Sequence, residues 1–132
     1  MKKDSEAALQ SAVIRYIKLK YPNIRYCASL GGIYNKSKAQ NRKVPATGYV
    51  AGVPDLQIME ARGGYFGLFI ELKLNKTRYP TPSQIGWLMD LNTRGYYAVC
   101  SKGFDETIKA IDDYLSEQAT RTLHEAAAPL KV

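Results

Sequence analysis

Two acidic residues and a lysine near the middle of the chain, Asp55, Glu71 and Lys73, are of types that together can do chemistry. Side chains on a strand alternate between its faces, so Glu71 and Lys73 should point the same way while Ile70 and Leu72 point the other way. Two charges would then share one face of an otherwise apolar strand. An unpaired charge is costly to bury, and the usual remedy is a partner of opposite charge or a metal ion.

Asp55 begins the strand expected to precede that of Glu71, so the two carboxylates can lie side by side. Because adjacent carboxylates repel each other, this arrangement favours a hard cation between them. Mg²⁺ and Mn²⁺ prefer carboxylate and carbonyl oxygens and retain waters that can act as nucleophiles. Lys73 would lie where such a water meets a phosphate. A metal and a lysine can orient the water and stabilise the transition state of phosphodiester hydrolysis.

Glu-x-Lys on a strand also has a purely structural interpretation. The pattern is frequent and commonly marks an ion pair on a solvated face of a sheet. Two neighbouring features favour the site: the apolar run from Leu68 to Ile70, and Pro54-Asp55 at the start of the preceding strand. We therefore treat the two carboxylates and the lysine as candidate catalytic residues.

The elements that must position these residues follow from hydrophobic spacing and from the turn residues between segments. Leu9, Val13 and Ile17 recur at helical spacing, and Ala61-Arg62-Gly63-Gly64 predicts a turn that joins two strands into a hairpin. The predicted order is α-β-β-β-α-β-α, with a helix capped by Asp4 or Ser5 and ending before Tyr21, strands over 24–30, 54–59 and 65–74, a helix from 81 to about 94, a strand over 96–100 and a helix over 104–115. We expect an α/β fold, a small mixed sheet with helices on both sides, as one domain over residues 1–117 with a tail or helix extension over 118–132.

The composition is that of one packed domain. The chain has 132 residues, of which 45% are hydrophobic and 23% charged, and this length suffices for a single core but not for two independent ones. No apolar run approaches the roughly 20 residues that span a bilayer, so we expect a cytoplasmic protein without membrane contact. Cys27 and Cys100 lie in apolar, strand-like segments with no paired spacing, so we expect buried thiols in a reducing compartment.

Charge is distributed unevenly along the chain. The net charge is +7, and no acidic residue occurs between Glu6 and Asp55, whereas the segment 104–117 carries five. A one-sided positive field suits DNA, because each phosphate that a protein neutralises releases condensed counterions. RNA, a membrane surface, or a basic face kept for solubility would fit the charge as well.

An ordered series of motifs makes the pattern more specific: Gly52-Val53-Pro54-Asp55, then Glu71-Leu72-Lys73, then Gln84-x-x-Trp87, then Gly95 before the last strand. Over roughly residues 5–115 this series resembles the VRR-NUC group of the PD-(D/E)XK nucleases. The resemblance implies the restriction-endonuclease-like fold and a site that depends on Mg²⁺ or Mn²⁺. It assigns Asp55, Glu71 and the backbone carbonyl of Leu72 to the metal, and Lys73 to the attacking water.

Four further residues are weaker candidates. Glu6 shares a helical stripe with apolar positions, and similar nucleases use a first-helix glutamate near the metal; alternatively, it is an acidic residue favoured by the helix dipole. Gln84 falls where the family has a glutamine near the active site, yet Thr81 and Gln84 also form a capping box. Lys76 and Arg78, just beyond the Glu-Leu-Lys strand, could hold phosphate or could be solvated charges.

The polar loop over 31–48 is a candidate DNA clamp. It combines cations with an aromatic side chain, which could contact phosphates or an unstacked base: Tyr34, Lys36, Lys38, Arg42 and Lys43. The loop is not part of the motif series that carries the resemblance, so its contacts are predicted from residue types alone.

The resemblance also suggests a substrate. Stand-alone members of the group, of viral or bacterial type, resemble Holliday junction resolvases that act as homodimers. A four-way junction needs two symmetric cuts, and a two-fold dimer supplies two matched sites. The leading hypothesis is a homodimeric Mg²⁺- or Mn²⁺-dependent endodeoxyribonuclease of DNA repair or recombination, in the host cytoplasm if the source is a virus. The alternatives are a flap or nicking endonuclease, a non-catalytic DNA-binding module, and a protein-interaction domain with a basic surface.

Overall fold

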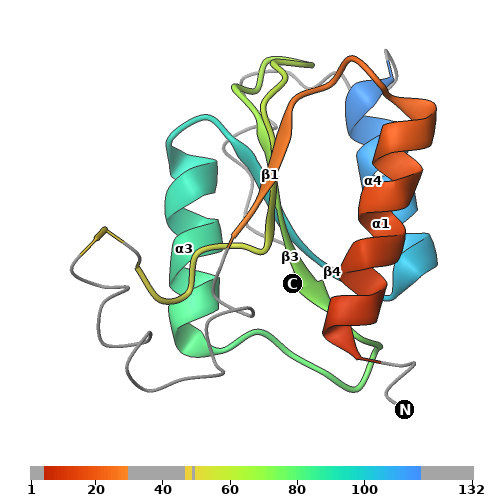
Figure 1. Ribbon diagram of the computed structural model, residues 1–132. Coiled ribbons are helices and arrows are strands. Elements are labelled where there is room, and N and C mark those ends of the chain that lie inside the picture. The colour runs from red at the N-terminus through yellow and green to blue at the C-terminus, as the bar shows by residue number, and fades with distance from the viewer. Residues whose placement is uncertain (1–4, 30–46, 49, 117–132) are drawn as a thin grey trace.

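The computed structural model describes residues 5–29, 47, 48 and 50–116. Its elements follow the predicted order: α1 Glu6–Lys20, β1 Tyr26–Ala28, β2 Leu56–Ile58, β3 Leu68–Lys73, α3 Pro82–Thr93, β4 Tyr97–Lys102 and α4 Phe104–Leu115. The four strands form one mixed sheet in the order β1-β2-β3-β4. Helices α1 and α4 cover one face of this sheet and α3 covers the other (Figure 1). The predicted α/β fold is confirmed.

The strands on the two sides of β3 run in different directions. β1, β2 and β3 pair antiparallel, whereas β3 and β4 pair parallel and are joined through α3. The β2–β3 connection closes at a tight turn in which the Tyr65 N–H donates to the Arg62 carbonyl at 2.9 Å. Gly63 and Gly64 have φ angles of 58° and 90°, in the left-handed region that glycine adopts without strain and that short hairpin turns require. The predicted hairpin is therefore confirmed.

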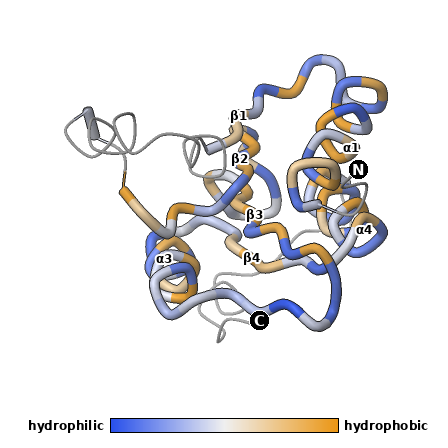
Figure 2. Tube along the Cα trace, turned by 60° about the horizontal axis from the view of Figure 1, so that its bottom comes forward, coloured by the Kyte–Doolittle hydropathy of each residue, from blue (hydrophilic) through white to orange (hydrophobic). Residues whose placement is uncertain are grey.

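The centre of the fold is β3, since all six of its residues are buried. Leu68, Ile70 and Leu72 belong to the larger apolar cluster under α1 and α4, whereas Phe69 packs against Leu88 of α3 on the opposite face. Figure 2 shows apolar segments in the strands, interrupted by hydrophilic residues, and helices with both apolar and hydrophilic residues. The two charged residues of β3 are in phase with Phe69, so they lie on the α3 face.

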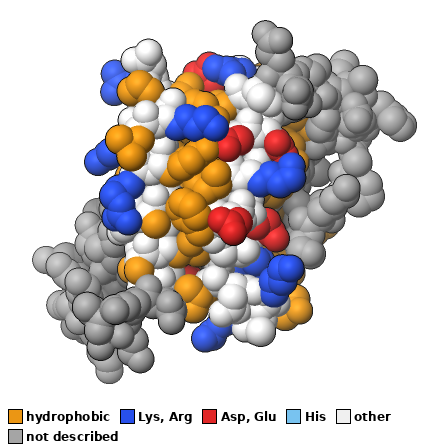
Figure 3. Space-filling model, turned by 90° about the vertical axis from the view of Figure 1, so that its right-hand side faces the viewer, with side chains coloured by type: hydrophobic (Ala, Val, Ile, Leu, Met, Phe, Trp, Pro, Cys, Tyr) orange, Lys and Arg blue, Asp and Glu red, His pale blue; other side chains and the backbone are white. Residues whose placement is uncertain are grey.

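A polar cluster joins α1 to α4 on the face of the sheet opposite α3. Asp112 accepts hydrogen bonds from Tyr16 Oη at 2.7 Å and Tyr21 Oη at 2.6 Å, and it pairs with Lys20 at 3.2 Å. Partial burial acts to raise the pKa of Asp112, but these donors outweigh it and the pKa is lowered. On this side, Figure 3 shows an apolar seam with Lys and Arg along one border and with Asp and Glu interspersed with further Lys and Arg beyond the other.

Two details of the first strand differ from the expectations. The first strand covers only Tyr26–Ala28 instead of 24–30, because it pairs with β2 over three residues. Cys27 is exposed, not buried, because it lies opposite Gln57 at the outer part of the sheet, whereas α3 packs on β3 and β4. Cys100 is half-buried, as part of that packing. Within the described part of the chain, no helix is long and apolar enough to cross a bilayer.

Candidate active site

The β2–β3 hairpin brings Asp55 beside Glu71. Leu56 pairs with Ile70, and the next step of this antiparallel register sets Asp55 opposite Glu71, on the α3 face of the sheet. The Leu72 N–H donates to Asp55 Oδ2 at 2.8 Å, which holds the Asp55 carboxyl against β3. Two carboxyl groups, one just before β2 and one in β3, therefore lie together on one face.

Glu71 is almost completely enclosed, with 2% of its surface exposed. Its Oε2 pairs with Lys73 Nζ at 3.6 Å, whereas its Oε1 is buried and accepts no hydrogen bond from the described residues. Burial raises the pKa of Glu71 and the Asp55 charge raises it further, an effect that Lys73 only partly opposes. The Asp55 carboxyl is near enough to accept a hydrogen bond from a protonated Glu71. The two acids therefore need either a shared proton or a cation between them.

A backbone carbonyl lies next to this pair. The N–H and C=O of one strand residue point to the same side, so the Leu72 carbonyl faces β2 as its N–H does. The residue opposite Leu72 in the β2–β3 register is Pro54, which has no N–H to donate to that carbonyl. Two carboxyls, one with an unsatisfied oxygen, and a backbone carbonyl are the oxygen donors that Mg²⁺ or Mn²⁺ prefers. The residues present therefore fit the implied metal.

Lys73 completes the set. It is 8% exposed, and its ammonium is held at the Glu71 carboxyl. A nearly buried ammonium beside two carboxyls keeps a fixed position, because few other conformers would satisfy its charge. The structure thus brings together Asp55, Glu71, the Leu72 carbonyl and Lys73.

Glu6 is not part of this group. It is exposed in the first turn of α1, a helix that packs on the other face of the sheet. Among the described residues, no three His, Cys, Asp or Glu side chains are clustered as a metal site. The structure therefore does not place a third carboxylate with Asp55 and Glu71.

Gln84 forms the predicted capping box. The Thr81 N–H donates to Gln84 Oε1 at 2.8 Å, and the Gln84 N–H donates to Thr81 Oγ1 at 3.2 Å. Its carbonyl oxygen is thus engaged at the start of α3. Its role in the active site remains a prediction.

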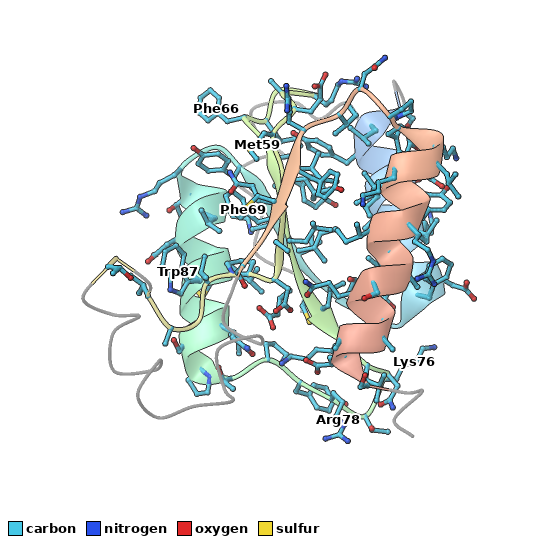
Figure 4. The ribbon with its side chains drawn as sticks, in the orientation of Figure 1. Met59, Phe66, Phe69, Lys76, Arg78 and Trp87 are labelled. Carbon is cyan, nitrogen blue, oxygen red and sulfur yellow. The ribbon has the colours of Figure 1, made fainter. Side chains whose placement is uncertain are left out.

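The predicted DNA contacts lie in two places. Lys76 and Arg78 are exposed in the segment that follows β3, below the sheet in Figure 4. The five loop residues lie outside the described part of the chain: Tyr34, Lys36, Lys38, Arg42 and Lys43.

Contacts between motifs could not be predicted from the sequence. Gly52 has a φ of 93°, and a Cβ there would lie 2.9 Å from Trp87 Cδ1 and also meet Ser83. Trp87 Nε1 donates to the Ala51 carbonyl at 3.1 Å. The segment before Asp55 is thereby anchored to α3. Both motifs are evident in the sequence, but neither contains a signal that they touch.

Strand β4 adds two residues to the surroundings of the site. Cys100 lies opposite Glu71 and Lys102 lies opposite Lys73 in the β3–β4 register. Burial raises the pKa of the Cys100 thiol, and the Glu71 charge raises it further. These neighbours depend on a parallel pairing between distant segments, so the sequence offered no direct signal for them.

Comparison with known proteins identifies the fold. A solved structure named VRR_NUC domain protein matches with a TM-score of 0.69 and 34% sequence identity, over 83% of this chain and 87% of that one. This chain belongs to the VRR-NUC domain family. A second structure, named VRR_NUC domain, matches at 21% identity and a TM-score of 0.49, over 80% of this chain and 97% of that one. No protein-family model and no curated protein matches the sequence.

Membership of the VRR-NUC family makes this a nuclease-type domain. Asp55 immediately precedes β2 and the Glu71-Leu72-Lys73 motif ends β3, and their charged side chains converge on the α3 face. This group of residues is the candidate active site of the domain.

Proposed function

We propose that the protein is a divalent-metal-dependent endonuclease that hydrolyses phosphodiester bonds in DNA. The observation that carries the proposal is the enclosed pair of carboxyls, Asp55 and Glu71, with a Glu71 oxygen that lacks a donor and with Lys73 beside it. The free-energy cost of burying two neighbouring carboxyls is tolerated in a fold when a bound ligand removes it. In a VRR-NUC domain, a cation is the simplest such ligand.

The residues of the candidate site have separate roles in this proposal. Asp55, Glu71 and the Leu72 carbonyl would hold Mg²⁺ or Mn²⁺, which supplies a bound water and charge stabilisation for phosphodiester hydrolysis. Burial of Glu71 keeps its carboxylate in one position and limits competition from bulk water. Lys73 holds a positive charge next to that carboxylate, where a phosphate oxygen that gains negative charge would be stabilised.

Branched DNA, with a four-way junction as the leading case, is the substrate that we propose. The net charge of +7 provides affinity for phosphates without regard to sequence. A two-fold homodimer would present two such sites in matched orientation, as two symmetric cuts require. Mg²⁺ or Mn²⁺, a homodimer and a role in DNA repair or recombination are parts of the same proposal.

The test is cleavage of labelled four-way junction, flap and linear duplex in Mg²⁺, in Mn²⁺ and in EDTA. We expect metal-dependent, symmetric cuts in the junction and no cutting by Glu71→Gln, which keeps the shape of the side chain. Asp90→Asn is the matched control, because Asp90 is exposed on α3 and pairs only at the surface with Arg94. Cutting of flaps alone would replace the resolvase with a flap endonuclease. Binding without products in either metal would favour a non-catalytic module.

A further inference from the structure

A second lysine lies on the strand next to the candidate active site. Lys102 is the last residue of β4 and lies opposite Lys73 in the parallel register. Side chains of paired residues in a parallel sheet point to the same face, so both lysines belong to the α3 face. Within the described part of the chain, no acidic side chain forms an ion pair with Lys102.

Tyr79 lies next to Lys102 and is exposed at the surface. Lys102 Nζ lies 3.7 Å from the centroid of the Tyr79 ring, within the range of a cation–π contact. Tyr79 is nevertheless 70% exposed, so its ring packs against the lysine on one side and leaves most of its surface open. An exposed aromatic ring held in place by a neighbouring cation, near the candidate active site, is suited to stacking on a base.

The segment that carries Tyr79 has a defined shape. The Thr77 N–H donates to Asn75 Oδ1 at 2.9 Å, and the Arg78 N–H donates to the Asn75 carbonyl at 3.1 Å. Pro80 is buried at its other end. Figure 2 shows this connection between β3 and α3 as a hydrophilic stretch, and Figure 4 shows Lys76 and Arg78 projecting from it. These two cations are exposed and form no ion pair among the described residues.

We propose that Tyr79 and Lys102 form a subsite for one unpaired nucleotide next to the scissile phosphate. Lys102 contacts the phosphate of that nucleotide, and Tyr79 stacks on its base. The faces of a paired base inside a duplex are covered by its neighbours, so only a base at a branch point, nick or end can take this position. Stacking on an aromatic ring tolerates any base. The subsite rests on the proposed function and gives it a reason to select branched DNA over linear duplex.

The test uses the full chain in EDTA, where binding is separated from cleavage. A four-way junction carries 2-aminopurine at its branch point, and stacking on a tyrosine would quench its fluorescence. We expect quenching with the wild type and with Tyr79→Phe, and loss of quenching with Tyr79→Leu, together with a dissociation constant roughly 5- to 150-fold higher. Phe66→Leu is the matched control, because Phe66 is 67% exposed and lies at the opposite end of the molecule from Arg78 (Figure 4).

Lys102 has a test of its own. Lys102→Gln should weaken binding and lower the slope of log K against log salt by about 1, as for one lost phosphate contact. Lys109→Gln, an exposed lysine of α4 that pairs with Asp113, should leave the slope unchanged.

The outcomes separate the subsite from the proposed function. Glu71-dependent cutting together with quenching that persists in Tyr79→Leu would overturn the subsite alone. Tyr79-dependent quenching without cleavage in either metal would support the subsite and contradict the endonuclease. Equal effects of Phe66→Leu and Tyr79→Leu would also overturn the subsite.

Discussion

Replacement of Glu71 by glutamine should abolish cleavage and yet stabilise the metal-free protein. In the folded chain, burial and the Asp55 charge raise the pKa of Glu71 from 4.5 to about 9. At pH 7 the folded protein therefore binds a proton that the unfolded chain does not, at a cost of about 3 kcal/mol. A raised pKa gives stability that is present below pH 4.5 and is lost as the pH rises toward the folded value.

The glutamine removes this cost because it carries no charge. Its amide can donate to Asp55 and its carbonyl can accept from Lys73, so the buried polar atoms keep partners. Because Glu71 is mostly protonated in the folded wild type at pH 8, Lys73 faces a neutral side chain in both proteins. We expect a net gain of about 1–3 kcal/mol at pH 8 in EDTA, or roughly 3–5 °C in Tm for each kcal/mol. Thermal unfolding from pH 5 to 9 measures the effect, with Glu60→Gln as the control, because Glu60 is a half-exposed carboxylate paired with Arg62.

Two results would refute this reasoning. The first is a Glu71→Gln protein that melts below the wild type at pH 8 in EDTA. The second is a wild type that gains no stability over the variant when about 10 mM Mg²⁺ or Mn²⁺ is added, because an ion that binds only the folded site must raise its stability.

Three further predictions concern the surroundings of the site. Gly52→Ala should lower the free energy of unfolding by about 1–3 kcal/mol, measured by urea denaturation, because φ is 93° and the new Cβ would meet Trp87. The control Gly86→Ala, whose new Cβ has nothing within 4 Å, should leave this free energy unchanged or raise it. Asp112→Asn should lower stability at neutral pH, and the deficit should shrink as the pH falls below 3.8, because a lowered pKa confers stability above that value and loses it in acid; an equal deficit at pH 3 and pH 7, again by denaturation, would contradict this. Gln84→Ala should cost about 1 kcal/mol through the lost capping box, and its predicted place near the active site should lower cleavage by roughly 10-fold or more; unchanged cleavage in a folded variant would leave Gln84 with the capping role alone.

The local parts of the fold could be predicted from the sequence. Period-two alternation set Glu71 and Lys73 on one face, and the glycine turn predicted the hairpin that sets Asp55 beside them. The capping box at Thr81 was also evident, because a cap depends on residues three positions apart. Each of these features is determined by neighbours in the chain.

Features that depend on packing between distant segments could not be predicted. Cys27 is exposed because α3 packs on β3 and β4, and a strand pattern contains no information on how far a helix extends across the sheet. The stripe on the first helix placed Glu6 near the core but not on a particular face of the sheet, and α1 packs away from Glu71. The neighbours of the site on β4, Cys100 and Lys102, follow from a parallel register that nothing in the sequence specifies.

Anomalous diffraction from crystals grown with Mn²⁺ would test the central claim most directly. We predict a peak bounded by the carboxyls of Asp55 and Glu71 and the carbonyl of Leu72, absent in crystals of Glu71→Gln grown in the same way. A wild-type crystal with no Mn²⁺ at these atoms, or with Mn²⁺ bound equally in the variant, would contradict the claim that the enclosed carboxyl pair is a metal site.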